Sequence, residues 1–328
     1  MKTNKIKRIG VLTSGGDSPG MNAAIRAVVR GAIYNKVKVY GIQRGYQGLV
    51  DNDMQEMHSH SVSNIIQIGG TILKTARCMD FMTAEGRRKA YENLVTRGID
   101  ALVTIGGDGT FAGAQELGEE FNFPIVGIPG TIDNDICGTD YTIGYDTALN
   151  TVVEAVDKIR DTASAHNRLF FIEVMGRNAG FLTLHGGIAT GAEAIMVPEY
   201  TNDFDMLNIF LNSAQKQHKT SSIVLVAEGD ELGGAIKLAK KVEKDHPEYD
   251  VRVTILGHIQ RGGSPSAIDR VNAGRMGVSA VEALLEGKKD MMVGLMNGKI
   301  VYSPFSRSKK EKRPLDPHLM DLIRILSI

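Results

Sequence analysis

The sequence predicts a soluble α/β protein with mainly parallel sheets. Three observations predict this class: apolar runs that are unbroken rather than alternating, helical apolar stripes between the runs, and a glycine-bearing loop directly after each run. Unbroken apolar runs that alternate with helices are typical of parallel strands buried on both faces. The chain has 328 residues, and at roughly 150 residues per domain it has room for about two domains.

The first unit of this pattern is a strand at Ile9–Thr13, the loop Ser14–Gly20 and a helix. The helix follows from apolar residues at Met21, Ala24, Ile25, Val28 and Val29, a spacing that keeps them on one face. Further strands are expected at 101–105, 125–128, 169–175, 223–227 and 251–256, and further helices at 148–159 and 269–286. A charged run at 309–313 is expected in solvent, before a last amphipathic helix. Ligands of parallel α/β sheets bind outside the carboxyl ends of the strands, where the glycine loops lie.

Composition excludes several classes of function. Lys plus Arg and Asp plus Glu both number 38, so the zero net charge disfavours a nucleic-acid or membrane-surface binder. Two cysteines, Cys78 and Cys137, form neither a disulfide framework nor a zinc cage. No apolar stretch approaches the roughly 18 residues of a membrane span, and the apolar run after the basic start is too short for a signal peptide. We expect a cytoplasmic protein.

Two glycine loops are candidates for binding phosphate. Thr13–Asp17 and Gly106–Thr110 each join a predicted strand to a predicted helix, where glycines let backbone N–H groups approach an anion. Asp108 stands between glycines, as a carboxylate that holds Mg²⁺ beside bound phosphates would. The second loop is not a Walker A loop, because no Gly-Lys-Ser/Thr follows. Taken separately, either loop can also be a tight turn.

A third loop, Pro129–Asp135, places Asp133 and Asp135 on either side of an asparagine at a strand end. Such a cluster can supply a general base, and it suits an Asx turn equally well. A set of arginines stands on or beside strand ends and glycine loops, and arginine binds phosphate oxygens bidentately. Together with His258 the set suggests a ligand with several phosphates; it comprises Arg77, Arg168, Arg177, Arg252 and Arg261.

Six segments in order carry a resemblance to a known family. They are Thr13–Asp17, Gly69–Thr71, Gly106–Gly109, Pro129–Asp135, Met175–Arg177 and Gly257–Pro265. Together they resemble bacterial ATP-dependent 6-phosphofructokinases, from Ile9 to about Glu286, although Gly-Gly-Asp-Gly alone is shared with kinases such as NAD kinase. The resemblance implies two Rossmann-like three-layer domains between which the chain crosses more than once. An ATP-binding domain would span 1–143 plus 259–308, and a sugar-phosphate-binding domain 144–258 plus 309–328.

The activity that the resemblance implies is transfer of the ATP γ-phosphoryl to the 1-hydroxyl of fructose 6-phosphate, the committed step of glycolysis. Asp133 would be the base, with Thr131, Arg177 and Arg77 neutralising charge on the transferring group. Asp108 would hold Mg²⁺. The nucleotide would be bound by Gly16, Arg77, Cys78, Gly107, Asp108, Gly109 and Thr110.

The sugar phosphate would be bound by residues of both predicted domains. Arg168 and Arg252 match residues that reach the 6-phosphate from a neighbouring subunit, which implies a homotetramer with shared active sites. The others are Thr131, Ile132, Asp133, Met175, Gly176, Arg177, Glu228, His258, Ile259, Gln260 and Arg261.

An effector site for ADP and phosphoenolpyruvate is also implied. Its residues would be Arg26, Arg30, Arg160, Gly191, Glu193 and Lys219. Arg26 and Arg30 are four residues apart and so share one helix face, which can equally be a solvated face. Ser59 stands where an Arg is expected, and Gln217, Thr220 and Ser221 replace members of a basic cluster. We therefore predict that phosphoenolpyruvate and ADP bind more weakly than in typical relatives.

Some positions depart from the family pattern. Gln43 and Cys78 replace aromatic residues expected beside the adenine, which leaves the choice between ATP and GTP open, and Lys74 replaces a small residue with no evident role. Pyrophosphate-dependent relatives usually carry Asp at Gly109 and Lys at Gly130, so the glycines favour ATP. The alternatives are a pyrophosphate-dependent enzyme, an NAD kinase-like phosphotransferase and a non-catalytic sugar-phosphate sensor.

Overall fold

The computed structural model describes residues 6–166, 168–200, 203–216, 222–231 and 233–326. The fold is α/β with mainly parallel sheets, as predicted. The chain divides into two compact units. Unit 1 comprises Met1–Thr131, Ile136–Thr147 and Arg261–Arg313, and unit 2 comprises Ile132–Asp135, Ala148–Gln260 and Pro314–Ile328.

Unit 1 is built on a sheet to which seven strands of the described residues belong. In sheet order they are β11 (Lys299–Pro304), β10 (Met291–Met296), β5 (Ile125–Pro129), β4 (Ala101–Gly106), β1 (Arg8–Thr13), β2 (Lys38–Ile42) and β3 (Met54–Met57). The central strands are parallel, whereas β3 and β11 pair antiparallel to their neighbours at the two edges. The carboxyl ends of the parallel strands β1, β4 and β5 therefore lie side by side at the same end of the sheet.

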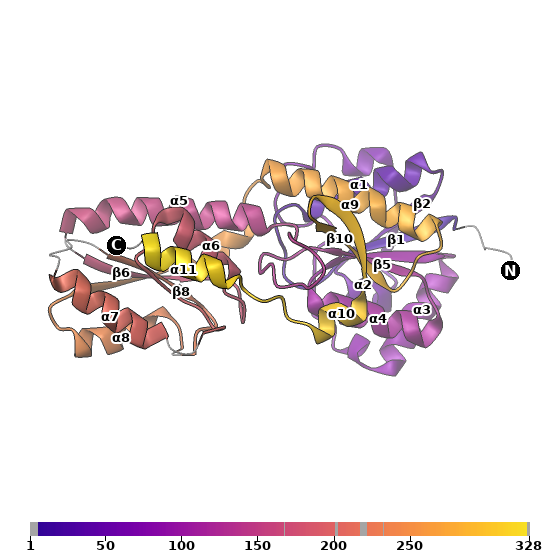
Figure 1. Ribbon diagram of the computed structural model, residues 1–328. Coiled ribbons are helices and arrows are strands. Elements are labelled where there is room, and N and C mark those ends of the chain that lie inside the picture. The colour runs from indigo at the N-terminus through magenta and orange to yellow at the C-terminus, as the bar shows by residue number, and fades with distance from the viewer. Residues whose placement is uncertain (1–5, 167, 201–202, 217–221, 232, 327–328) are drawn as a thin grey trace. The chain divides into compact units, whose positions relative to one another are not determined.

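Helices cover both faces of this sheet (Figure 1). On one face α1 (Met21–Tyr34) and α9 (Ala267–Leu285) pack together and share a core with β1 and β4. The opposite face carries α2 (Tyr46–Asp51), α3 (Ala84–Thr96), α4 (Asp108–Phe121) and α10 (Phe305–Lys310). This is the three-layer arrangement expected when strands are apolar on both faces.

Unit 2 repeats the plan on a smaller sheet, to which four strands of the described chain belong. In sheet order they are β7 (Ala194–Met196), β8 (Ser222–Ala227), β6 (Arg168–Val174) and β9 (Asp250–Ile255), all parallel. One face carries α7 (Asp203–Lys216) and α8 (Ala235–Asp245), and the other α5 (Tyr145–His166), α6 (Phe181–Thr190) and α11 (Pro317–Leu326), as Figure 1 shows.

Buried hydrogen bonds join the first turn of α9 to the start of α5, within unit 1. The carboxylate of Asp269, in the first turn of α9, accepts from the backbone N–H groups of Gly144 (2.8 Å) and Thr147 (2.9 Å), at the start of α5. It also accepts from the Thr147 hydroxyl at 2.5 Å. The side chain of Asp269 is buried, and this desolvation raises its pKa. Both helix starts are thus held together inside unit 1.

Within the charged run at 309–313, Glu311 and Lys312 are exposed and Arg313 is not. Arg313 is half-buried and donates from Nη1 to the carbonyl of Asp140 at 2.8 Å, and burial lowers the pKa of its guanidinium.

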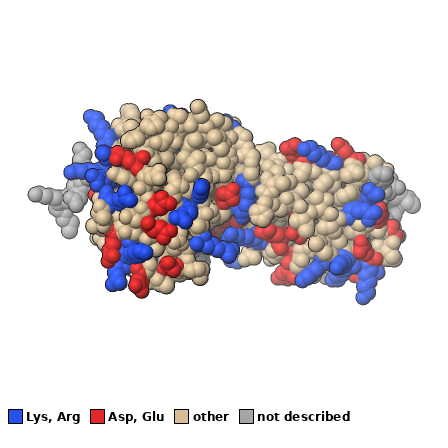
Figure 2. All heavy atoms as spheres, turned by 180° about the vertical axis from the view of Figure 1, so that it is seen from behind, with Lys and Arg blue, Asp and Glu red and all other residues tan. Residues whose placement is uncertain are grey.

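On the face drawn in Figure 2, basic and acidic side chains are interspersed, as their equal numbers allow. None of the helices in the described part of the chain has the length and apolar character needed to cross a membrane.

Candidate active site

The first glycine loop follows β1 directly. The Ser14 N–H donates to the carbonyl of Ile105 at 3.0 Å, which ties this loop to the end of β4. A Cβ at Gly16 would meet Nη1 of Arg261, so any larger residue there would displace that guanidinium. The same Nη1 donates to the carbonyl of Asp17 at 3.0 Å. The structure thus brings Arg261 against the first loop, from far along the chain.

The second glycine loop joins β4 to α4, with Gly107 at the N-cap and Asp108 as the first helical residue. The Thr110 hydroxyl donates to the carbonyl of Ser14 at 3.1 Å and so links the two loops. Asp108 is exposed, and a Cβ added at Gly109 would meet no atom within 4 Å. The first N–H groups of an α-helix have no partner inside the helix. We call the loop residues Gly15, Gly16 and Gly107–Thr110 the glycine cradle.

The third loop follows β5, at the same carboxyl end of the sheet as the other two loops. The Gly130 N–H donates to the carbonyl of Gly106 at 3.0 Å, and a Cβ at Gly107 would lie 3.7 Å from Cβ of Thr131. Thr131 therefore lies beside the cradle. The next residues, Ile132 and Asp133, belong to unit 2, and both are buried.

Arg77 and Cys78 lie on the segment before α3. Arg77 is exposed, whereas Cys78 is half-buried against the core beneath α4, and this desolvation raises the pKa of its thiol. Two aromatic residues that the sequence analysis did not consider lie in the same core. Tyr46 and Phe81 stack with their ring centroids 4.1 Å apart, and the Tyr46 hydroxyl donates to the carbonyl of Thr110 at 2.5 Å. The position of Phe81, three residues after Cys78, is the sequence feature from which an aromatic residue near this segment could have been predicted.

In unit 2, the loops after β6 and β8 are joined. Gly176 and Arg177 have φ of 144° and 52°, and the Arg177 N–H donates to Oε1 of Glu228 at 2.7 Å. Gly229 is required because a Cβ there would lie 1.8 Å from the Arg177 carbonyl oxygen. The side chain of Arg177 is exposed.

The segment that follows β9 lies beside the loop that follows β6. Gln260 is fully buried, accepts from the Met175 N–H at 3.2 Å and donates to the Gly257 carbonyl at 2.9 Å. His258 and Ile259 are exposed. Met175, Arg177, Glu228 and Gln260 are therefore brought together at the carboxyl ends of β6, β8 and β9, which is where parallel α/β sheets bind ligands.

Arg168 and Arg252 lie elsewhere, toward the amino end of the same sheet. Nε of Arg168 donates to Oδ2 of Asp250 at 2.9 Å, and Nη1 of Arg252 lies 2.6 Å from Oδ1 of the same carboxylate. The two arginines thus form one charged cluster. Within this chain they do not join the residues at the carboxyl ends of β6 and β8.

The predicted effector residues fall into two groups. Arg26 and Arg30 lie on α1, half-buried and exposed respectively. In unit 2, Arg160 donates to the carbonyls of Thr190 (2.9 Å) and Gly191 (2.8 Å) and lies 3.3 Å from Oε1 of Glu193. Lys219 lies outside the described residues.

Comparison with known proteins bears on the whole chain. The family profile described as "Phosphofructokinase" matches residues 8–284. The chain belongs to the phosphofructokinase family. It is 58% identical to the ATP-dependent 6-phosphofructokinase 2 of Bacteroides thetaiotaomicron, over 98% of this chain and 99% of that phosphofructokinase. It is 54% identical to the ATP-dependent 6-phosphofructokinase of Halalkalibacterium halodurans, over 98% of this chain and 100% of the relative.

Solved structures of phosphofructokinases have the same fold as this chain. The phosphofructokinase of Saccharomyces cerevisiae superposes with a TM-score of 0.85 at 40% identity, over 93% of this chain. This chain spans 45% of that longer yeast chain. A pyrophosphate-dependent phosphofructokinase from Marinobacter aquaeolei, at 21% identity and a TM-score of 0.83, shares the fold.

Proposed function

We propose that this chain is an ATP-dependent 6-phosphofructokinase, which converts ATP and fructose 6-phosphate into ADP and fructose 1,6-bisphosphate. The observation that carries the proposal is the open glycine cradle beside Thr131, in a chain 58% identical over nearly its whole length to a relative of that name. Because Gly109 leaves room at the first turn of α4, a nucleotide phosphate can approach the backbone N–H groups there.

In the proposed reaction, the 1-hydroxyl oxygen of the sugar attacks the γ-phosphorus, and the bond from that phosphorus to the β–γ bridging oxygen breaks. Asp133 accepts the hydroxyl proton, and ADP leaves. Phosphoryl transfer depends on positioning and charge stabilisation more than on covalent catalysis. Arg77, Thr131 and Arg177 supply that stabilisation.

The carboxylate of Asp108 at the glycine cradle is a suitable ligand for Mg²⁺ that is bound together with nucleotide phosphates. No three His, Cys, Asp or Glu of the described residues gather into a metal site, but Mg²⁺ in phosphotransferases is commonly held by one or two carboxylates plus substrate phosphates. Asp108, exposed at the open cradle, is suited to be such a carboxylate. The ion would screen phosphate charge when it is bound with ATP.

The sugar phosphate would be bound by the unit 2 loops, with Glu228, Met175 and His258 facing the sugar, and Arg261 is proposed as a further ligand of it. An ATP-binding domain of residues 1–143 plus 259–308 and a sugar-phosphate domain of 144–258 plus 309–328 follow from this division. The compactness of units 1 and 2 supports it.

A homotetramer with shared active sites is part of the proposal. Its support is the Arg168–Asp250–Arg252 cluster, which lies at the sheet end away from Met175 and Arg177 of its own chain. A cluster in that place can serve the 6-phosphate of a neighbouring subunit. With these substrates, the expected location is the cytoplasm.

The effectors ADP and phosphoenolpyruvate are proposed to bind more weakly than in typical relatives. The guanidinium of Arg160 already donates to two carbonyls at the end of α6 and pairs with Glu193. An effector phosphate would compete with these contacts. Initial velocity against fructose 6-phosphate, with and without millimolar phosphoenolpyruvate, tests this; strong sigmoidal inhibition would contradict it.

The deciding experiment is a coupled assay of fructose 6-phosphate phosphorylation with ATP, GTP or pyrophosphate as the donor. We expect activity with ATP, measurable activity with GTP because Gln43 and Cys78 are not aromatic, and none with pyrophosphate. Activity with pyrophosphate alone would point to the pyrophosphate-dependent class. Phosphorylation of NAD in place of the sugar would point to an NAD kinase-like enzyme, and sugar-phosphate binding without turnover to a sensor.

A further inference from the structure

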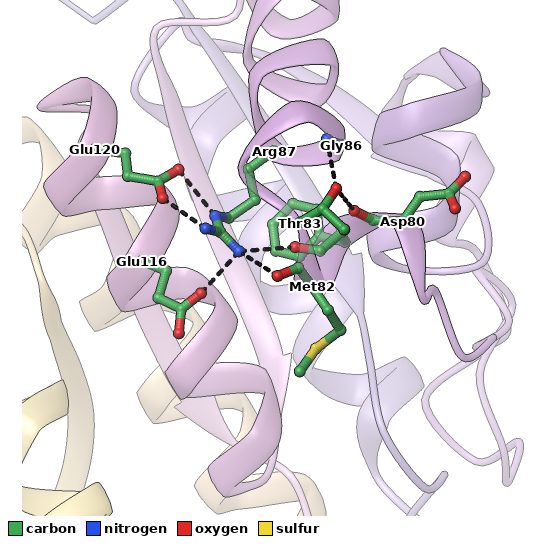
Figure 3. Close-up of polar contacts among 8 residues, drawn as sticks. Asp80, Met82, Thr83, Gly86, Arg87, Glu116 and Glu120 are labelled. Atoms are coloured by element: carbon green, nitrogen blue, oxygen red, sulfur yellow. Dashed lines mark hydrogen bonds and ion pairs between the residues drawn. The ribbon is translucent and has the colours of Figure 1, made fainter.

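The buried side chain of Arg87, on α3, is the centre of a charged network that joins α3 to α4. Its Nε and Nη2 donate to the two carboxylate oxygens of Glu120 at 2.8 and 2.6 Å, and its Nη1 lies 2.9 Å from Oε2 of Glu116. Both acidic residues belong to α4 (Figure 3). Arg87 is 8% exposed, whereas the side chains of Glu116 and Glu120 are 47% and 34% exposed. These ion pairs attach α3 to the helix whose first turn forms part of the cradle.

The same guanidinium holds the turn before α3. Nη1 donates to the carbonyls of Phe81 (3.2 Å) and Met82 (2.9 Å). Thr83 caps α3 by accepting from the Gly86 N–H at 3.0 Å, and its hydroxyl donates to the Asp80 carbonyl at 2.7 Å. Figure 3 shows Arg87 between this turn and α4. The turn 80–83 is therefore fixed by backbone contacts as well as by its cap.

The turn is connected to the proposed nucleotide site on both sides. Arg77 and Cys78 immediately precede it in the chain. Phe81, within it, stacks on Tyr46, whose hydroxyl donates to the carbonyl of Thr110 in the cradle. A shift of the turn relative to α4 would therefore move residues proposed to meet the phosphoryl donor.

We propose that Arg87 is a positioning residue for the nucleotide: with Glu116 and Glu120 it fixes the segment 77–82 relative to α4, and thereby sets the affinity for ATP. The inference rests on the proposed function, because it assigns the segment to the donor site. All three guanidinium nitrogens of Arg87 are engaged by protein oxygens. It therefore acts through the segment rather than by contacting phosphate.

The test compares Arg87→Met with Arg88→Met as the matched control. Arg88 is the next residue on α3, and its side chain is 64% exposed. We expect Arg87→Met to raise KM for ATP about tenfold and also to lower kcat, because Arg77 lies in the displaced segment and misplacing a group by on the order of 1 Å can cost up to about a hundredfold in rate. KM for fructose 6-phosphate should stay within twofold of the wild-type value. Arg88→Met should change none of the three. A purely stabilising role would lower Tm and the active fraction without moving KM for ATP.

A second variant covers the case in which Arg87→Met does not fold. Glu116→Gln removes one charge at a side chain that is 47% exposed, and it should raise KM for ATP about threefold. An unchanged KM for ATP in whichever of these variants is folded, or an equal rise in KM for both substrates, would overturn the inference.

Calorimetric binding of ATP to wild type and variants separates this inference from the proposed function. A wild-type protein that binds ATP but does not phosphorylate fructose 6-phosphate would refute the activity alone. In that case a tenfold weaker affinity of Arg87→Met for ATP would still support the positioning role, and an unchanged affinity would refute it.

Discussion

Replacing Gly109 with alanine tests whether phosphates lie against the first turn of α4. Gly109 is the second residue of that helix, and the added methyl group meets no atom within 4 Å. Alanine is also the better helix former by about 1 kcal/mol. The variant should therefore fold at least as well as the wild type, so that any loss of activity reports on the ligand.

The size of the effect follows from what the methyl group displaces. It occupies the open side of the cradle and holds a phosphate away from the N–H groups of the helix start. The loss of one charge-assisted hydrogen bond corresponds to about 1.5–3 kcal/mol. At about 1.4 kcal/mol per factor of ten, KM for ATP should rise between about tenfold and a hundredfold, with KM for fructose 6-phosphate unchanged.

The measurement is the coupled assay at saturating fructose 6-phosphate with varied ATP, together with a thermal unfolding curve. Gly274→Ala is the matched control, because Gly274 also lies on a helix, α9, and a Cβ there likewise meets no atom within 4 Å. A Gly109→Ala enzyme with unchanged Tm and a KM for ATP within twofold of wild type would show that the nucleotide phosphates lie elsewhere.

Three further predictions concern a catalytic group, a buried acceptor and a titrating ion pair. Asp133→Ser should lower kcat by about 10²–10⁴-fold, since that is what a general base contributes; near-wild-type turnover of the folded variant would remove Asp133 from the mechanism. Asp269→Ala leaves three donors without their acceptor and should lower the free energy of unfolding by about 2–4 kcal/mol; an unchanged Tm would contradict this. The hydrogen bond from Arg87 lowers the pKa of Glu120 below its usual 4.5, so its contribution to stability is present above that pH and is lost as pH falls through the lowered pKa. The Tm deficit of Glu120→Gln should therefore be largest near pH 7 and shrink below about pH 4.5; a pH-independent deficit would exclude the ion pair as its cause.

The sequence by itself determined the fold class, the order of the main strands and the loops that follow them. Hydrophobic periodicity is a local property, so residues within one or two turns predicted a strand at 125–128 and a helix from the apolar stripe Met21–Val29. The structure has them as Ile125–Pro129 and Met21–Tyr34. The family also followed from sequence, because the order of six motifs is preserved whatever the detailed packing.

Only the tertiary structure decided which of those residues meet. Arg261 packs on Gly16, and Arg168 pairs with Asp250 at the end of the sheet away from Met175. The antiparallel edge strands and the stack of Phe81 were not predicted either. Such contacts join residues separated by tens to hundreds of positions, and no local pattern encodes them. Their geometry is set by how strands register and how helices pack across a sheet, which depends on the whole core rather than on neighbouring residues.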